Sequence, residues 1–264
     1  MTLFLERSHY YHLAARGRLS GIKTVGKFGA APSGIQTTPT DIWDRANAAA
    51  TQSIWLAPTS PRVHTIQSTS VQDTTGGTGV DTIRVSYLPD WDTKEVTVTL
   101  TGDINAGIVM DEAAVIIHRM QCIAQASTTN VGLNEGTITA TAAVDGTITA
   151  AILPSNGQTE MAIYGVPSSQ YIEIVRWNVQ IDRASQVTAT ADFTLRLNTN
   201  PDVQTVAFTR KDDISLQSTG TNAQERNYAV PKIFSGPCII KIQGISSAND
   251  LDGESGFDAL IVDK

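Results

Sequence analysis

The sequence predicts an all-β protein: an antiparallel β-sandwich or jelly-roll-like body with an extended N-terminal arm. Short runs of alternating apolar and polar residues recur through most of the chain, a pattern typical of strands with one buried face. Turns rich in Gly, Asn, Asp and Pro separate these runs. Helix formers dominate only residues 111–125, where the Val115-Ile116-Ile117 run favours a strand. We therefore expect strand residues to outnumber helical residues at least about threefold.

The segment 74–101 shows the pattern most clearly. A Gly-rich turn at residues 76–79 leads into an alternating run at 82–87, and the Pro89-Asp90 turn leads into a second run at 95–101. Such runs form an antiparallel pair that buries one side of each strand. We expect the following residues to face the core: Ile83, Val85, Tyr87, Val96, Val98 and Leu100.

The remaining strands are expected at similar intervals. A local repeat, residues 136–140 and 146–150, predicts two neighbouring strands joined by a hairpin at Asp145-Gly146. The other expected strands are Val63–Ser70, Ala113–Ala126, Glu160–Tyr164, Tyr171–Ile181, Thr188–Leu197, Val203–Thr209, Ile214–Gln217, Ile239–Ile245 and Phe257–Val262.

Residues 1–58 lack the strand pattern and are interpreted as the arm, and residues 59–264 as the body. An alternative for the body is two smaller sandwiches divided near residues 154–159. Because the arm would be a poor independent fold, we expect it to dock on neighbouring subunits. Deletion of residues 1–28 is then expected to leave a folded domain that no longer assembles.

Charge is unevenly distributed along the chain. Residues 1–28 contain five basic residues and one acidic residue, a net +4, so the rest of a chain of net charge −7 carries −11. This asymmetry favours docking of the arm on another copy or another acidic surface over nucleic-acid binding, and a merely solvated terminus is a third alternative. The residues expected to mediate assembly are the cations Arg7, Arg16, Arg18, Lys23 and Lys27 and the buried anchors Trp43 and Trp55.

Sequence motifs give no support for catalysis or for a cofactor. The four histidines, His9, His12, His64 and His118, lie in unrelated contexts, and neither Cys122 nor Cys238 belongs to a C-x-x-C pair. No nucleotide-binding, zinc-protease or hydrolase motif occurs. The acidic run at residues 249–258 does not match the spacing of a calcium loop, so we interpret it as a polar hairpin loop. We expect no metal and no organic cofactor.

Membrane and export signals are not apparent in the sequence. No apolar run approaches the roughly 18 residues needed to cross a bilayer. At the N-terminus, Glu6, His9 and Arg16 interrupt the stretch where a signal peptide requires continuous apolar residues. We expect a soluble chain that is not secreted by that route.

Several segments, in order and across nearly the whole chain, are similar to a family of tailed-bacteriophage virion structural proteins often seen in marine and cyanobacterial phages. Residues 67–85 resemble the hallmark S-S-x-x-D-x-x-x-G-T-G-A-x-T-V-R-V of that family. The chain departs from the pattern at Gly165, where Thr is usual, and at Ser168-Ser169, where Ala-Gly is usual. The other matching segments are 25–29, 38–43, 95–102, 134–139, 158–167 and 256–263.

The resemblance implies a non-enzymatic β-sandwich component of a virion, assembled in the host cytoplasm. The expected partners are further copies of the chain, as a trimer or higher homo-oligomer, and other virion proteins such as the major capsid or portal and neck proteins. Capsid decoration or a head-fibre base is the preferred position, and a neck or tail component is the alternative.

Two alternatives come from other functional classes. A glycan hydrolase would need paired carboxylates in a cleft, and the adjacent acid pairs are Asp90/Asp92, Asp111/Glu112 and Asp212/Asp213. A receptor- or glycan-binding module of the particle would need exposed aromatic residues, for which Trp91 and Tyr228 are the candidates.

Overall fold

The computed structural model describes residues 7–44, 52–125, 133–182, 188–202, 207–249 and 251–264. Within these residues it contains one helix, α1 (Arg7–Ala15), and sixteen strands. The strands β1 and β11 alone contain 14 and 13 residues, against nine in α1, so the predicted all-β class is confirmed. The strands are β1 (Ile22–Ile35), β2 (Thr40–Asp41), β3 (His64–Ser68), β4 (Val80–Leu88), β5 (Lys94–Thr99), β6 (Ile108–Val109), β7 (Ile116–Gln125), β8 (Ile138–Ala142), β9 (Ile148–Ile152), β10 (Ile163–Val166), β11 (Gln170–Asp182), β12 (Thr190–Asn198), β13 (Thr209–Gln217), β14 (Ala223–Ser235), β15 (Cys238–Ser246) and β16 (Leu251–Asp263).

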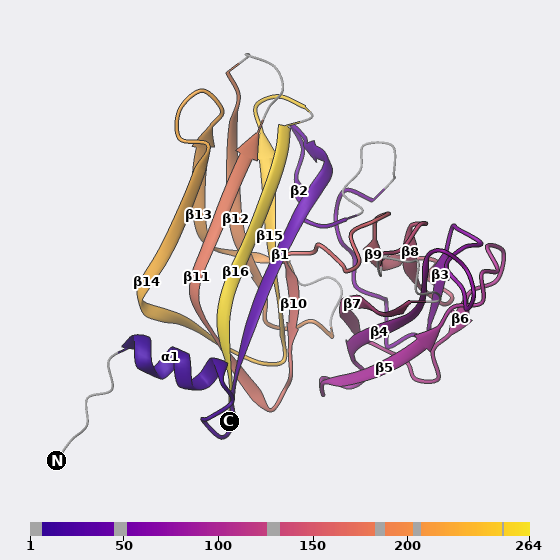
Figure 1. The fold of residues 1–264 in the computed structure, drawn as a ribbon. Helices are drawn as coiled ribbons and strands as arrows, with labels where there is room; N and C mark the ends of the chain where they lie inside the picture. The colour runs from indigo at the N-terminus through magenta and orange to yellow at the C-terminus, as the bar shows by residue number, and fades with distance from the viewer. Residues whose placement is uncertain (1–6, 45–51, 126–132, 183–187, 203–206, 250) are drawn as a thin grey trace.

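Two antiparallel sheets form a jelly roll (Figure 1). One sheet has the order β1-β16-β11-β14, and the other has the order β10-β15-β12-β13 with β2 also paired to β15. Apart from the neighbours β12 and β13, which pair in one sheet, successive strands alternate between the sheets, as in the double Greek-key arrangement of jelly rolls. The space between the sheets is filled by large apolar side chains, among them Trp177, Phe193 and Phe257, each at most 1% exposed.

A second β unit interrupts one strand of this jelly roll. The short strands β2 and β10 both pair with β15. Between them, the Ile42 amide donates to the Ile242 carbonyl, and the Ile242 amide donates to the Ala162 carbonyl. The Ala162 amide also donates to the Ile42 carbonyl, and Trp43 forms an isolated bridge with Met161. The chain therefore leaves a jelly-roll strand after Ile42 and returns to its continuation at Ala162.

The inserted unit is a smaller sandwich (Figure 1). Its sheets have the orders β6-β3-β8-β9 and β5-β4-β7, and every strand pairs within the unit. The predicted antiparallel pair is present as β4 and β5, with Ile83 opposite Val98 and Val85 opposite Val96. The hairpin at Asp145-Gly146 joins β8 to β9. The chain passes back to the jelly roll between Ile152 and Ile163, the interval in which we expected two smaller sandwiches to divide.

The structure corrects the interpretation of the leader. Residues 22–35 were expected to lie in an arm outside the body, but they form β1, whose pairing with β16 extends from Ile22–Val262 to Ile35–Leu251. Deletion of residues 1–28 would thus remove half of a body strand, so we no longer expect it to leave a folded domain.

Two further segments differ from the sequence prediction. The acidic run at 249–258 was interpreted as a loop, yet β16 begins at Leu251 and contains Asp252 and Glu254. Strand β14 was not predicted. Part of the strand expected at Val203–Thr209 lies outside the described residues.

Candidate functional site

The predicted assembly residues separate into exposed and buried groups. Arg16, Arg18 and Lys23 are exposed. Lys27 is buried, and its ammonium donates to the backbone carbonyl of His118 at 2.5 Å, so it does not belong to a docking surface. Arg7 lies in α1, but its side chain is outside the described part of the chain.

The exposed arginines lie on a rigid turn at the end of α1. The Arg18 amide donates to the Leu13 carbonyl and the Gly17 amide to the Ala14 carbonyl, which is the hydrogen-bond pattern of a Schellman cap. Gly17 has a φ of +62°, the left-handed conformation that this cap requires. The cap fixes the backbone from which Arg16 and Arg18 project.

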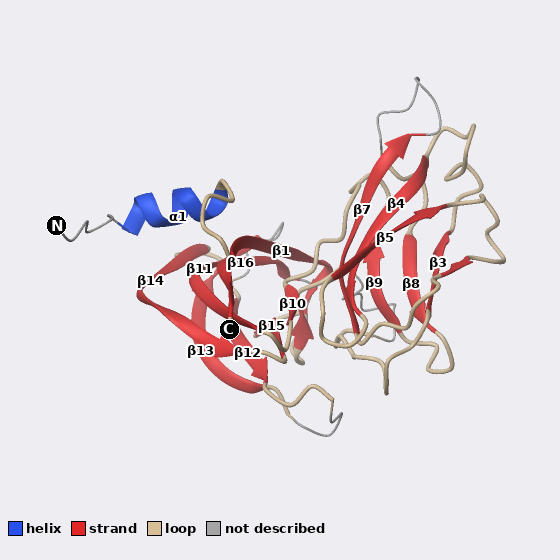
Figure 2. Cartoon of the chain, turned by 90° about the horizontal axis from the view of Figure 1, so that it is seen from below, coloured by secondary structure: helices blue, strands red, loops and turns tan. Residues whose placement is uncertain are grey.

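Helix α1 covers one end of the outer face of the β1-β16-β11-β14 sheet, the face turned away from the other jelly-roll sheet (Figure 2). Ala259 and Ile261 belong to the core, so Leu260 between them points outward by strand alternation. Leu260 is nevertheless only 2% exposed. Burial, followed by the charge of Glu173 on β11, raises the pKa of Tyr10 on α1. The helix is therefore part of the body surface.

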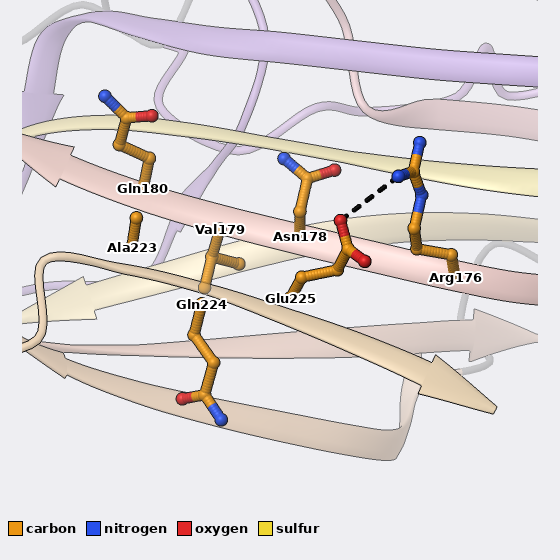
Figure 3. A pocket seen from close by; sticks show the side chains of 7 residues that line it. All are labelled: Arg176, Asn178, Val179, Gln180, Ala223, Gln224 and Glu225. Atoms are coloured by element: carbon orange, nitrogen blue, oxygen red, sulfur yellow. Dashed lines mark hydrogen bonds and ion pairs between the residues drawn. The ribbon is translucent and has the colours of Figure 1, made fainter.

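Beyond α1 the outer face is open. A shallow groove of about 440 Å³ runs between β11 and β14 (Figure 3). Arg176 lies at one end of it and pairs with Glu225 at 3.1 Å and with Asp258. Farther along β16, Asp252 and Glu254 are exposed. The centre of this face is thus charge-paired, and its far end is acidic.

The two tryptophans of the leader lie at the junction between the jelly roll and the inserted unit. Trp43 and Trp55 are 0% and 1% exposed. The Trp55 indole donates to the Thr149 carbonyl at 2.8 Å, and its backbone amide donates to Asp41 Oδ2 at 2.8 Å. Both rings are buried as expected, but within the chain itself, so their burial needs no neighbouring copy.

The same junction buries several ionisable groups. Desolvation lowers the pKa of Lys27 to about 7 and raises that of Asp44 to about 8. Desolvation, followed by the charges of Lys27 and Arg119, lowers the pKa of His118 to about 3. The His118 ring packs on Tyr164 with a centroid distance of 4.8 Å, which keeps the neutral imidazole in a dry site.

We expect His118 to make the protein less stable in acid. The pKa of His118 is lower in the folded chain than its ordinary value of 6.5, so below pH 6.5 the unfolded chain takes up a proton that the folded chain does not. Between pH 6.5 and 5 this difference costs about 2 kcal/mol. Urea unfolding at both pH values should show that His118→Gln removes about this much of the loss, whereas His12→Gln, at an exposed position on α1, does not. An unchanged loss in His118→Gln would contradict this assignment.

The hallmark segment is organised by a residue to which the sequence analysis gave no role. Asp73 is fully buried, and its carboxylate accepts hydrogen bonds from the amides of Val80, Glu135 and Gly136 and from the Ser68 hydroxyl. A Cβ on Gly79 would lie 2.0 Å from Asp73 Oδ1, which explains the glycine at that position. The segment therefore has a structural task, the joining of β3, β4 and β8.

Members of two of the candidate acid pairs are held in ion pairs at the surface, and the third pair, Asp90/Asp92, is exposed. Glu112 pairs with Lys94 at 2.7 Å and accepts from the Tyr87 hydroxyl, and Asp213 pairs with Arg210 at 2.8 Å. Asp212 pairs with Arg226 and Lys232.

The two candidate aromatic residues for ligand binding also form hydrogen bonds within the chain. Trp91 is 5% exposed and its indole donates to Asp202 at 2.6 Å, and the Tyr228 hydroxyl donates to Asp212. Trp91 is thus not an exposed aromatic tip.

Within the described ranges no group of three or more His, Cys, Asp or Glu side chains is arranged to hold a metal ion, and no helix is long and apolar enough to span a bilayer. Cys122 and Cys238 are free thiols, and burial raises the pKa of each to about 12.

Comparison with known proteins yields only distant similarity. No protein-family model and no curated protein matches the chain. Among solved structures, a mutant VP2 protein of infectious bursal disease virus in T=1 particles aligns at 10% identity over 92% of this chain and 69% of that chain, with a TM-score of 0.26. The VP2 subviral particle of the same virus aligns at 12% identity over 93% and 73%, with a TM-score of 0.25. Similarity at this level carries no argument about function.

Proposed function

We propose that this chain is a non-enzymatic structural component of a tailed-bacteriophage virion that assembles in many copies on the particle. Decoration of the capsid or the base of a head fibre is the preferred position. Its partners are further copies of itself and other virion proteins, such as the major capsid or portal and neck proteins. The sequence resemblance covers nearly the whole chain and is the reason for proposing a tailed-bacteriophage particle.

The observation that carries the proposal is that large apolar side chains fill the interior of the jelly roll. Jelly rolls occur in viral capsid proteins, but also in lectins and cupins, so the fold alone does not select a function. A binding or catalytic jelly roll needs convergent polar or aromatic groups in an open pocket. Here Trp177, Phe193 and Phe257 fill the interior, and several surface acids, among them Glu112, Asp212 and Asp213, are held in ion pairs.

The surface of the chain supports assembly more than ligand binding. The outer sheet face carries a rigid basic turn at one end and unpaired carboxylates at the other. Complementary charge of this kind orients protein partners. The buried junction of the two sandwiches gives such a component a fixed shape without a cofactor.

Purified mature particles provide the test. Quantitative mass spectrometry should detect the chain in many copies relative to the major capsid protein, and cryo-electron microscopy should place its two-sandwich shape on the capsid. A host ribosomal protein measured in the same sample sets the level of contamination. Density confined to the neck or tail selects the alternative position, and absence of the chain above contamination disproves the proposal.

A further inference from the structure

The turn formed by Arg16, Gly17 and Arg18, called here the arginine turn, has no partner within the described chain. Both arginines are exposed, and neither forms an ion pair with a described residue. The Schellman cap holds the backbone in place, so binding has to order only the two side chains. A cation at the end of a helix also interacts favourably with the helix dipole. The turn therefore presents two guanidinium groups from a fixed backbone.

A complementary surface extends from the middle of the outer sheet face to its far end. It consists of Phe28 on β1 and Asp252 and Glu254 on β16, and is called here the acceptor patch. Both carboxylates are exposed and form no ion pair with a described residue, while the Phe28 side chain is 44% exposed. The negative charge of Glu254 also contributes, after burial, to a raised pKa of Glu160.

The geometry of the acceptor patch suits arginine. Phe28 pairs in register with Gly256, and Glu254 pairs with Ala30, so small residues leave the ring and the carboxylates accessible. Asp252 and Glu254 are two residues apart on one strand, a separation of about 7 Å. Guanidinium groups bind carboxylates through paired hydrogen bonds and also stack on aromatic rings, which lysine does less well.

The arginine turn cannot reach the acceptor patch of its own chain. It precedes Ile22, which pairs with Val262, and Glu254 lies eight residues from Val262 along β16. At the rise of a strand this separation is about 26 Å, far beyond the length of an arginine side chain. Complementary groups at opposite ends of one face can meet only between two molecules.

We infer that the acceptor patch on the outer sheet face binds the arginine turn of a second copy of this chain. The contact is head-to-tail, so every copy offers one turn and one patch, and the assembly closes into a ring or extends as a filament. We expect a closed ring of three or more copies. The inference rests on the proposed function for its setting, an assembly of many copies, but its test uses the purified chain alone.

A charge exchange between two variants tests the inference. Arg16→Glu/Arg18→Glu places an acidic turn against an acidic patch, and Asp252→Lys/Glu254→Lys places a basic turn against a basic patch. Sedimentation velocity at low salt should show an assembled wild type and a rise of about tenfold or more in the dissociation constant of each variant alone. An equimolar mixture should assemble again, as alternating assemblies with an even number of copies, because each reversed element then meets its complement only in the other variant.

Matched reversals elsewhere provide the control. Arg84→Glu/Lys211→Glu and Asp90→Lys/Asp92→Lys change exposed charges by the same amounts and should assemble like the wild type. Circular dichroism should show the same strand content in every variant.

A monomeric wild type, assembly of either reversed variant at the wild-type affinity, or failure of the mixture to recover would each overturn the inference. None of these results bears on whether the chain is present in purified particles, which tests the proposed function separately.

Discussion

Replacement of Asp73 by alanine is expected to lower the free energy of unfolding by about 4 kcal/mol or more. The buried carboxylate accepts from the amides of Glu135, Gly136 and Val80 at 2.9, 3.0 and 3.1 Å. Alanine would leave these three donors without an acceptor in a buried site, and each such donor costs about 1–3 kcal/mol. Urea unfolding measures the loss, and hydrogen exchange should show faster exchange at the three amides.

A surface aspartate with a similar local role is the matched control. Asp103 Oδ1 accepts from the amides of Asn105 and Ala106 at 2.8 and 3.2 Å, but these groups are exposed to water. Asp103→Ala should therefore cost no more than about 1 kcal/mol. Equal losses in the two variants would show that Asp73 is not the organising residue of the hallmark segment.

The sequence alone was sufficient to predict the strands that bury only one face. From Ile83 to Tyr87 the apolar residues of β4 alternate with polar residues, and the pattern therefore predicts the strand. Strand β1 lies at the edge of its sheet, where it tolerates Pro32 and several glycines that weaken the same signal. Strand β14 is also an edge strand and is largely exposed on both sides, so no alternation marks it.

The candidate site was predictable only in part. The excess of cations in the leader identified Arg16 and Arg18, but composition could not show that Lys27 is buried, because burial depends on the distant strand β7. The carboxylates of the acceptor patch were visible as an acidic run. Their position on a strand face depends on the pairing of β16 with β11 and with β1, and the pairing with β1 joins residues more than 200 positions apart. Contacts of this range leave no local pattern.

Replacement of Asp41 by asparagine is expected to destabilise the chain by about 3–5 kcal/mol. Asp41 is fully buried and accepts from the Lys241 ammonium at 2.6 Å, the Gln243 amide at 2.9 Å and the Trp55 backbone amide at 2.8 Å. Lys241 is 3% exposed and lies over the Phe208 ring, so without Asp41 its charge remains buried and uncompensated. Chemical unfolding of the purified variant measures the loss.

Two further variants distinguish the destabilising effect of an unpaired buried charge from the effect of losing a contact. Glu112→Gln breaks the exposed pair with Lys94 and should cost less than about 1 kcal/mol, because water screens both groups. Asp41→Asn/Lys241→Met removes both buried charges and should be more stable than Asp41→Asn alone, since no unpaired ion remains. Two results would contradict the assignment of Lys241 as an unpaired buried charge in Asp41→Asn. One is a double variant that is no more stable than Asp41→Asn. The other is a loss of unfolding free energy in Asp41→Asn that is no larger than the loss in Glu112→Gln. The comparison with the double variant is decisive because only an unpaired buried charge can be relieved by removing a second polar group from the junction.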